Sequence, residues 1–341
     1  MVASTGKKLR FGLFTDFRNP LQWRRPFKDV YAESIEQIAW AETIGYEDVW
    51  LSEHHFTEDG YGPSPIVQAA AIAVKTKKIR IGTSVLLLPL YDPVRLAEDA
   101  ATVDILSGGR FELGAGLGYR PEEFAGFGLK LKDRGGRANE ALEIIRRLWE
   151  GETVTFKGKH FQIENARLSP RPVQEPRPPI WVGGFSRPAA RRAARLGDGF
   201  VGIGDMREIY QMYLEELRAA GKDPSQAKVG GGPWWVIVSN DPEKTWHEIA
   251  PHLVYQLTLY SKWLGSTGQN LFPPVHDVAS LKATGIVNVV PPEGAVKIIK
   301  DFIAEVPVER FYTMTLPVGF PPKKMNEHLE LFATKVMPHF R

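Results

Sequence analysis

The sequence predicts an α/β protein, a (β/α)8 TIM barrel with insertions. Its 341 residues suit one large barrel or two mid-sized domains. Eight strand-like runs alternate with helical segments, and the runs are continuously apolar, as in parallel strands covered on both faces. Polar and glycine-rich segments follow several of these runs, at the strand ends where a barrel gathers its reacting groups. A doubly wound open sheet would show the same alternation and remains a rival fold.

The predicted strands are short apolar runs, most of them bounded by charged residues or glycine. In chain order they are Leu9–Phe17, Asp48–Ser52, Ile79–Leu88, Arg110–Gly116, Pro179–Gly184, Gly199–Gly204, Pro233–Ser239 and Arg310–Leu316.

The predicted helices carry start and stop signals. Asp92 precedes Pro93 as a cap, and the Gly108-Gly109 pair ends the same helix. The helices are Tyr31–Ile44, Pro65–Thr76, Pro93–Leu106, Arg137–Trp149, Pro188–Leu196, Arg207–Ala220, Glu243–Trp263, Val296–Ala304 and Lys323–Met337.

Two segments interrupt this rhythm, at about residues 152–178 and 261–292. The first carries a hairpin-like piece, and the second is rich in Gly, Ser and Pro. Long irregular stretches inside a compact domain are often functional loops. We therefore expect a single barrel domain over residues 1–341 with two insertions, the second of which is an active-site lid.

Composition excludes several classes of function. Lys plus Arg number 43 and Asp plus Glu 40, so the net charge of +3 is too small to indicate a nucleic-acid or membrane-surface protein. The absence of cysteine excludes disulfides, thiolate metal sites and thiol catalysis. We find no signal peptide and no apolar run of about 18 residues, and we expect a cytoplasmic protein.

The most informative motif is Glu53-His54-His55-Phe56, directly after the second strand. At the carboxyl end of a barrel strand, these titratable groups would face the mouth. Neighbouring side chains on a strand point in opposite directions, so the two histidines would not share one metal ion. We expect one histidine to face the pocket and the other to bond laterally. A purely structural histidine pair remains an alternative.

Two glycine-rich segments close later strands. Gly114-Ala115-Gly116-Leu117-Gly118 lacks the spacing of a dinucleotide fold and is better suited to a close approach of backbone to a flat ring or a phosphate. Gly183-Gly184-Phe185-Ser186-Arg187 precedes a helix whose N-terminal amides would attract a phosphate. Ordinary turns and a plain serine cap are the alternatives.

Two other patterns carry no function. His247-Glu248 and His252 are spaced one residue too far apart for a zinc-protease motif, and Pro251 lies between them, so we expect no metal site. The arginines of the helix Pro188–Leu196 lack interleaved aromatic residues, so we expect no nucleic-acid partner.

Five motifs together resemble the bacterial luciferase-like flavin-dependent oxidoreductases, and they occur in the order of that family. They are W-L-S-E-H-H-F (Trp50–Phe56), I-G-T-S-V-L-L-L-P-L-Y-D-P-V-R (Ile81–Arg95), L-S-G-G-R-F-E-L-G-A-G-L-G (Leu106–Gly118), F-Q-I-E-N-A-R-L-S-P-R-P-V-Q (Phe161–Gln174) and P-P-I-W-V-G-G (Pro178–Gly184).

The resemblance implies roles for individual residues. His54 matches the catalytic histidine of luciferase, beside Glu53, and the peptide between Ser84 and Val85 matches a non-prolyl cis bond under the flavin ring. The remaining matches are to the strand end next to the ring and to the phosphate-binding turn. They are Gly114 and Gly116 for the ring, and Gly183, Gly184, Ser186 and the adjoining Arg187 for the phosphate. Leu117 and the Gly184-Phe185 pair depart from luciferase, which favours the wider family over a light-emitting enzyme.

The resemblance, together with the missing cysteines, favours a flavin-dependent monooxygenase. Such an enzyme would use reduced FMN from a separate flavin reductase, and molecular oxygen, on a hydrophobic or aromatic small-molecule substrate. His54 would be the general acid/base or hydrogen-bond donor. The resemblance also implies a homodimer. Two alternatives stay open: a dehydrogenase or reductase that uses a deazaflavin coenzyme of F-420 type, and a non-catalytic flavin-binding barrel.

Overall fold

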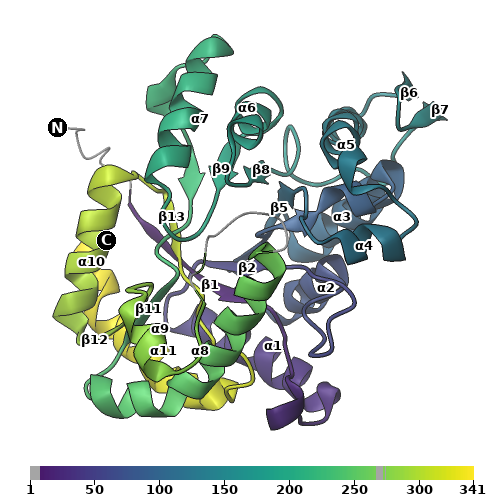
Figure 1. Ribbon diagram of the computed structural model, residues 1–341. Coiled ribbons are helices and arrows are strands. Elements are labelled where there is room, and N and C mark those ends of the chain that lie inside the picture. Colours follow the sequence, from purple (N-terminus) through teal and green to yellow (C-terminus); the bar gives the residue numbers. More distant parts are fainter. Residues whose placement is uncertain (1–7, 266–271, 273) are drawn as a thin grey trace.

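Eight parallel strands close into a barrel in the order in which they occur along the chain (Figure 1). The computed structural model describes residues 8–265, 272 and 274–341. The last barrel strand pairs with the first, and β3 pairs with β5, so the sheet has no open edge. The predicted (β/α)8 barrel is therefore confirmed, and the alternative of an open sheet is excluded. Its strands are β1 (Arg10–Thr15), β2 (Asp48–Leu51), β3 (Arg80–Thr83), β5 (Phe111–Gly116), β8 (Ile180–Gly183), β9 (Gly199–Val201), β10 (Val229–Gly230) and β13 (Arg310–Tyr312).

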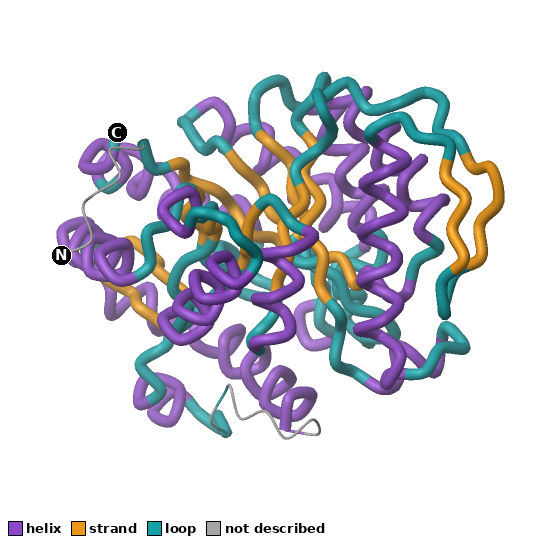
Figure 2. Tube along the Cα trace, turned by 90° about the horizontal axis from the view of Figure 1, so that it is seen from above, coloured by secondary structure: helices purple, strands orange, loops and turns teal. Residues whose placement is uncertain are grey.

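Helices surround the barrel, as the view from above shows (Figure 2). The Asp92 side chain accepts hydrogen bonds from the backbone N–H groups of Val94 and Arg95, which confirms it as a helix cap. The long helices are α1 (Phe27–Thr43), α2 (Pro65–Lys75), α3 (Pro93–Ser107), α5 (Arg134–Trp149), α6 (Arg187–Leu196), α7 (Arg207–Ala219), α8 (Pro242–Gly265), α10 (Pro292–Glu305) and α11 (Pro322–Lys335).

The third predicted strand is interrupted at the site. It divides into β3 and the short β4 (Leu86–Leu87), and the Ser84–Val85 peptide between them is cis, as the resemblance predicted. β4 pairs with the last two residues of β5. The interruption therefore brings residues 84 and 85 to the carboxyl end of the barrel.

The seventh predicted strand was wrongly placed. The barrel position belongs to β10, whereas the predicted residues form β11 (Trp235–Val238), which pairs with β12 (Val287–Val290) in a separate parallel sheet. Gly230 ends β10, and Gly231 and Gly232 begin the connection to β11. Gly231 has φ +143°, and a Cβ there would lie 2.1 Å from the carbonyl oxygen of Gly202, so only glycine lets the chain turn out of the barrel at this point.

The two insertions differ from each other. The first contains the predicted hairpin, β6 (Val154–Lys157) and β7 (Gln162–Ala166), which projects beyond α5 (Figure 1). The second is more regular than expected, since it contains α9 (Val278–Ala283) and β12. The predicted lid falls partly on residues 266–271 and 273, which lie outside the described residues.

Charged residues fill the amino-terminal end of the barrel. Arg310 lies between two buried carboxylates, with Nη1 2.6 Å from Asp48 and Nη2 2.8 Å from Glu112. Burial raises the pKa of Asp48 even though the charge of Arg310 opposes the shift. Above this layer, Trp50 stacks on Tyr312 at 5.0 Å and meets Trp181 edge-on at 6.0 Å. The charged layer and the aromatic layer above it close the amino-terminal end of the barrel, so ligands reach the barrel from the carboxyl end.

Candidate active site

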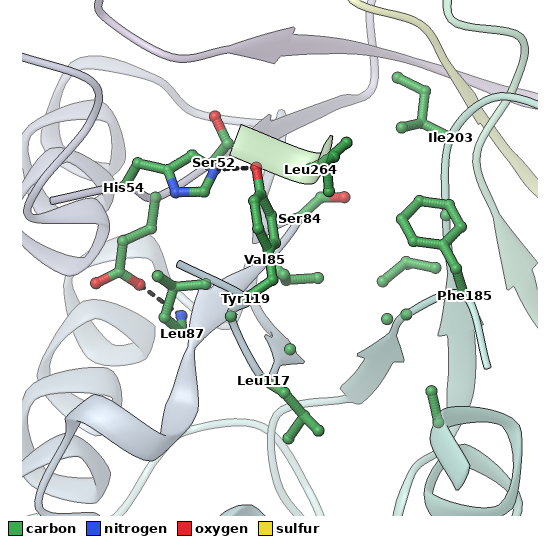
Figure 3. Close-up of a pocket in the computed structure, with 18 of the residues that line it drawn as sticks. Ser52, His54, Ser84, Val85, Leu87, Leu117, Tyr119, Phe185, Ile203 and Leu264 are labelled. Atoms are coloured by element: carbon green, nitrogen blue, oxygen red, sulfur yellow. Dashed lines mark hydrogen bonds between the residues drawn. The ribbon is translucent and has the colours of Figure 1, made fainter. Parts of the chain in front are cut away.

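A cavity of about 250 Å³ opens at the carboxyl ends of the strands (Figure 3). It is lined by residues that follow almost every barrel strand, and α8 contributes to its wall. The lining is mainly apolar and aromatic. Among the described residues that line the cavity, Glu53 supplies the carboxylate and Arg134 supplies the guanidinium group. Apolar walls with a few fixed polar groups are typical of pockets for small organic ligands.

His54 is the imidazole that faces this cavity, and a carboxylate binds the nitrogen on its other side. Its Nδ1 lies 2.7 Å from Oε1 of Glu123, which belongs to the short helix α4 (Pro121–Gly126). Burial alone would raise the pKa of Glu123, but hydrogen bonds from His54 and from the His55 backbone, with the charge of Arg120, outweigh it and lower the pKa. An ionised carboxylate only accepts hydrogen bonds, so Nδ1 carries a hydrogen and Nε2 is left toward the cavity.

The second histidine bonds laterally, as expected. His55 is absent from the cavity lining, and its Nε2 lies 2.7 Å from Oε1 of Glu53. The Glu53 carboxylate also accepts from the Leu87 backbone N–H at 2.6 Å and from the Tyr91 hydroxyl at 2.7 Å. Glu53 lies in the lining, and its hydrogen bonds connect the end of β2 to β4 and to the turn after β4. The carboxylate that holds His54 is Glu123, not its sequence neighbour.

Aromatic rings surround His54 on its cavity side. The Tyr119 hydroxyl lies 3.3 Å from Nε2 and points at the imidazole (Figure 3). The rings of Tyr61 and Trp263 lie 4.7 Å and 5.3 Å from the imidazole, measured between centroids. Burial raises the pKa of Tyr119 well above its ordinary value, so its hydroxyl stays protonated. The site therefore offers an imidazole nitrogen and a neutral phenol side by side.

The predicted ring-adjacent residues build a platform around Val85. A Cβ on Gly116 would lie 2.3 Å from Cγ2 of Val85, and one on Gly183 would lie 2.6 Å from Cγ1. Ser84, Val85, Gly116 and Gly183 all line the cavity. Gly114 does not; a Cβ there would lie 1.7 Å from the Thr83 carbonyl oxygen, so it allows β3 and β5 to approach. Gly116 and Gly183 therefore make room for the Val85 side chain, which lines the cavity.

The predicted phosphate turn is only partly as expected. Gly184, at φ +147°, and Ser186 line the cavity, and the Ser186 carbonyl accepts the first helical hydrogen bonds of α6. Its side chain forms no capping hydrogen bond. Arg187 was predicted to add charge to this turn, but its guanidinium instead pairs with Glu215 at 2.7 Å on α7 and is absent from the lining. The cation that does line the cavity is Arg134, at the start of α5.

Sequence reasoning missed Glu123 and Arg134, and it also missed the site roles of Tyr61, Tyr119 and Tyr260. One signal was available: Pro121 followed by Glu122 and Glu123 is typical of a helix start. A helix there would have placed a carboxylate close to the Gly114–Gly118 strand end. The tyrosines had no such signal, because only the folded chain brings them together.

Within the described ranges, we find no group of three or more His, Asp or Glu side chains arranged to hold a metal ion. No helix in the described part of the chain has the length and apolar character needed to cross a membrane.

The barrel and its cavity define an α/β-barrel enzyme with a histidine–carboxylate pair at the strand ends. The family described as luciferase-like monooxygenase matches residues 9–274. The chain therefore belongs to the luciferase-like monooxygenase family, which confirms the prediction of an oxidoreductase of this kind.

Relatives that are named for different coenzymes are similar to this chain in sequence. The chain is 33% identical over 200 residues to an F420-dependent glucose-6-phosphate dehydrogenase of Amycolatopsis mediterranei, covering 57% of this chain and 59% of the relative. It is 33% identical over 176 residues to the oxygenase component of a flavin-dependent trigonelline monooxygenase of Acinetobacter baylyi, covering 51% and 48%. The chain thus spans about half to six tenths of the length of these curated relatives.

A solved structure extends the similarity of fold over nearly the whole chain. The oxygenating constituent of 3,6-diketocamphane monooxygenase from Pseudomonas putida, in complex with FMN, superposes with a TM-score of 0.79. The match covers 98% of this chain and 99% of that one at 21% identity, which supports the fold.

Proposed function

We propose that this protein is the oxygenase component of a flavin-dependent monooxygenase, acting with reduced FMN and molecular oxygen on an apolar organic substrate. The observation that carries the proposal is the His54–Glu123 pair, held at 2.7 Å, facing an apolar cavity beside the Val85 platform. When bound, reduced FMN supplies the activation of oxygen. The chain supplies an enclosed, water-poor space and a single well-oriented proton donor and acceptor.

The residues present fit an FMN molecule. The Val85 side chain offers an apolar contact for a ring system, and the glycines at 116 and 183 leave the space that this side chain occupies. At the other end, the Gly183–Ser186 turn and the first amides of α6 would receive the phosphate, with Arg134 as the counter-charge. Arg187 takes no part in this proposal because it pairs with Glu215 and Glu216.

His54 would hold or move the proton that the reaction needs at its Nε2. Glu123 keeps Nδ1 protonated and the ring fixed, and it stabilises the imidazolium whenever His54 gains a second proton. Tyr119, 3.3 Å from Nε2, would orient that nitrogen or exchange a hydrogen bond with it. The rings of Tyr61 and Trp263 pack against the imidazole and would restrict the access of water to it.

A deazaflavin-dependent dehydrogenase is the second candidate. The deazaflavin dependence of the relative from Amycolatopsis mediterranei supports it, and the same histidine would then move a substrate proton. Among the described lining residues, Arg134 supplies the guanidinium group. This one positive charge is little to balance a coenzyme that has a long anionic tail. This charge balance favours FMN.

One experiment separates the candidates. Anaerobic titration of the purified protein with reduced FMN and with reduced deazaflavin measures which coenzyme binds, and an oxygen electrode then measures uptake on mixing with air in the presence of apolar ketones and arenes. We expect tight binding of FMN and oxygen-dependent product. Deazaflavin binding without oxygen uptake would refute the first candidate and support the second.

Variants of the two histidines test the catalytic assignment. We expect His54→Ala to lower turnover by about 100-fold or more, as loss of a general acid/base does. His55→Gln is the matched control, because His55 belongs to the same motif but bonds to Glu53 outside the cavity lining. Unchanged turnover in His54→Ala would refute the catalytic assignment of His54, whereas flavin binding without turnover in the parent chain would support a non-catalytic flavin-binding barrel.

We also propose a homodimer formed through α2 and α3, with a separate flavin reductase as the source of reduced FMN. These helices pack side by side and expose four apolar side chains: Val67 and Val74 on α2, and Ile105 and Leu106 on α3. Exposed apolar patches of this kind are typical of contact surfaces. Analytical ultracentrifugation of Val67→Lys/Val74→Lys against the parent chain tests the interface, and an unchanged dimer would refute it.

A further inference from the structure

Two tyrosine hydroxyls meet on the wall of the cavity. The hydroxyl oxygens of Tyr61 and Tyr260 lie 2.7 Å apart, and both residues line the cavity that His54 faces. Tyr61 comes from the loop after β2, and Tyr260 from α8. A pair linked by one hydrogen bond uses one of its two hydroxyl hydrogens. The other can go to a ligand in place of the protein acceptors at hand, which are Ser52 beside Tyr61 and Gln256 beside Tyr260.

Both phenols are neutral donors. Burial raises the pKa of Tyr61 well above its ordinary value, and burial raises that of Tyr260 to about 12 against the opposing charge of Arg18. Each therefore keeps its hydrogen near neutral pH. Tyr61 also touches the imidazole of His54, with ring centroids 4.7 Å apart, so the pair lies next to the reacting end of the cavity.

A buried arginine lies behind this pair. The Arg18 guanidinium is 4.7 Å from the ring centroid of Tyr61 and 5.8 Å from that of Tyr260. Its Nε donates to Asp59 at 2.8 Å, and its side chain is fully buried. A cation close to the rings polarises the phenols as hydrogen-bond donors. Because Asp59 and Asp16 offset the charge of Arg18, this wall of the cavity does not favour an anionic ligand.

We propose that the Tyr61–Tyr260 hydroxyl pair is the subsite for the carbonyl oxygen of an otherwise apolar substrate. Neutral donors backed by a cation suit an uncharged acceptor oxygen, and the rest of the wall, including Trp234, Phe272 and Met314, suits an apolar skeleton. This inference rests on the proposed function, since it assigns this part of the cavity to the substrate. Arg18 acts through the tyrosines and is a positioning residue.

Three probes with one bicyclic skeleton test the assignment without turnover. They are 1-tetralone, which carries a carbonyl, tetralin, which carries none, and 1-aminotetralin, which is cationic at pH 7. Calorimetry measures their dissociation constants on the full chain, with and without oxidised FMN. We expect 1-tetralone to bind about tenfold more tightly than tetralin, as one hydrogen bond would allow, and the amine to bind most weakly.

The preference should disappear in Tyr61→Phe/Tyr260→Phe while the affinity for tetralin stays the same. The single variants, which remove one hydroxyl each, should show a reduced preference and serve if the double variant does not fold. Tyr255→Phe is the matched control: its hydroxyl also lies in the Arg18 cluster, 3.1 Å from Asp59, but Tyr255 is not among the lining residues.

A preference for 1-tetralone that survives the double variant would overturn the proposal, and so would equal binding of 1-tetralone and tetralin, or tighter binding of the amine. Failure of FMN to bind would refute the proposed function but leave the probe preference standing, so the two failures are distinguishable.

Discussion

The charge of Glu123 can be removed with almost no change of shape. Glu123→Gln keeps an acceptor oxygen where Oε1 now receives the His54 ring at 2.7 Å, the His55 backbone at 2.9 Å and Arg120 at 3.3 Å. A hydrogen bond to an ionised acceptor contributes more than one to a neutral amide, and the side chain is fully buried. We expect the variant to lower the free energy of unfolding by about 1–2 kcal/mol at pH 7.

The loss should depend on pH with a defined sign. The folded-state pKa of Glu123 lies below its ordinary value of 4.5. Its ionised form therefore stabilises the fold fully above that value, and this contribution is lost as the pH falls through the folded-state pKa. The difference between the parent chain and Glu123→Gln should stay constant from pH 7 to about 5 and shrink from there to pH 4 and below.

Urea unfolding at several pH values measures both effects, and a double-mutant cycle with His54→Gln assigns them to the pair. In the His54→Gln background, the cost of Glu123→Gln should fall by about 1 kcal/mol, because part of the interaction is already gone. If the cost stays the same in both backgrounds, or stays constant down to pH 4, Glu123 does not hold His54 through its charge.

Three further predictions follow from other parts of the barrel. Burial raises the pKa of Asp16 from 3.8 to about 6, so the ionised carboxylate opposes folding as the pH rises through 6. Asp16→Asn should therefore raise the free energy of unfolding by about 3 kcal/mol at pH 7. Near pH 3.5 the same variant should change this free energy little. Arg310→Met should cost about 3–5 kcal/mol in urea unfolding, because it leaves the Asp48 and Glu112 carboxylates buried without a partner, and a loss below 1 kcal/mol would contradict this role. Gly116→Ala should weaken FMN binding by about tenfold, because the new methyl group displaces Val85. An unchanged FMN dissociation constant in this variant would argue against the Val85 platform.

Most of the barrel could be predicted because its signals are local. Each strand is a short apolar run, and caps such as Asp92 and the Gly108-Gly109 pair mark helix ends within a residue or two. Such patterns depend on neighbours in the chain, so the alternation of strands and helices survives without knowledge of tertiary contacts.

The seventh strand shows where local signals fail. Trp235–Val238 has the apolar, β-branched pattern of a strand and is one, but it pairs with β12 and not with the barrel. The barrel position goes to Val229-Gly230, which is too short and too rich in glycine to be recognised. Pairing partners are set by where the chain turns, and here Gly231 sets the turn through a contact with Gly202 that lies far away in sequence.

The candidate site divides in the same way. His54 and the Ser84–Val85 bulge lie at strand ends, and the resemblance located both. Arg187 looked suitable because it follows the glycine turn, yet Glu215 and Glu216 on α7 draw it to the outside of the barrel. The cation in the lining, Arg134, comes from a different helix. Side-chain partners of this kind depend on how helices pack, which sequence spacing does not encode.

The arrangement of charge explains why this barrel suits a borrowed redox cofactor. Its ionised groups either neutralise one another, as Arg310 does with Asp48 and Glu112, or serve to hold a neighbour, as Glu123 does for His54. Glu53 is occupied by His55, Leu87 and Tyr91. Among the described residues, the polar groups left to face the cavity are an imidazole nitrogen, neutral hydroxyls and the Arg134 guanidinium, which transfer protons or form hydrogen bonds but do not transfer electrons. A site built in this way contributes position and proton control, which is what the proposed flavin cofactor needs from the protein.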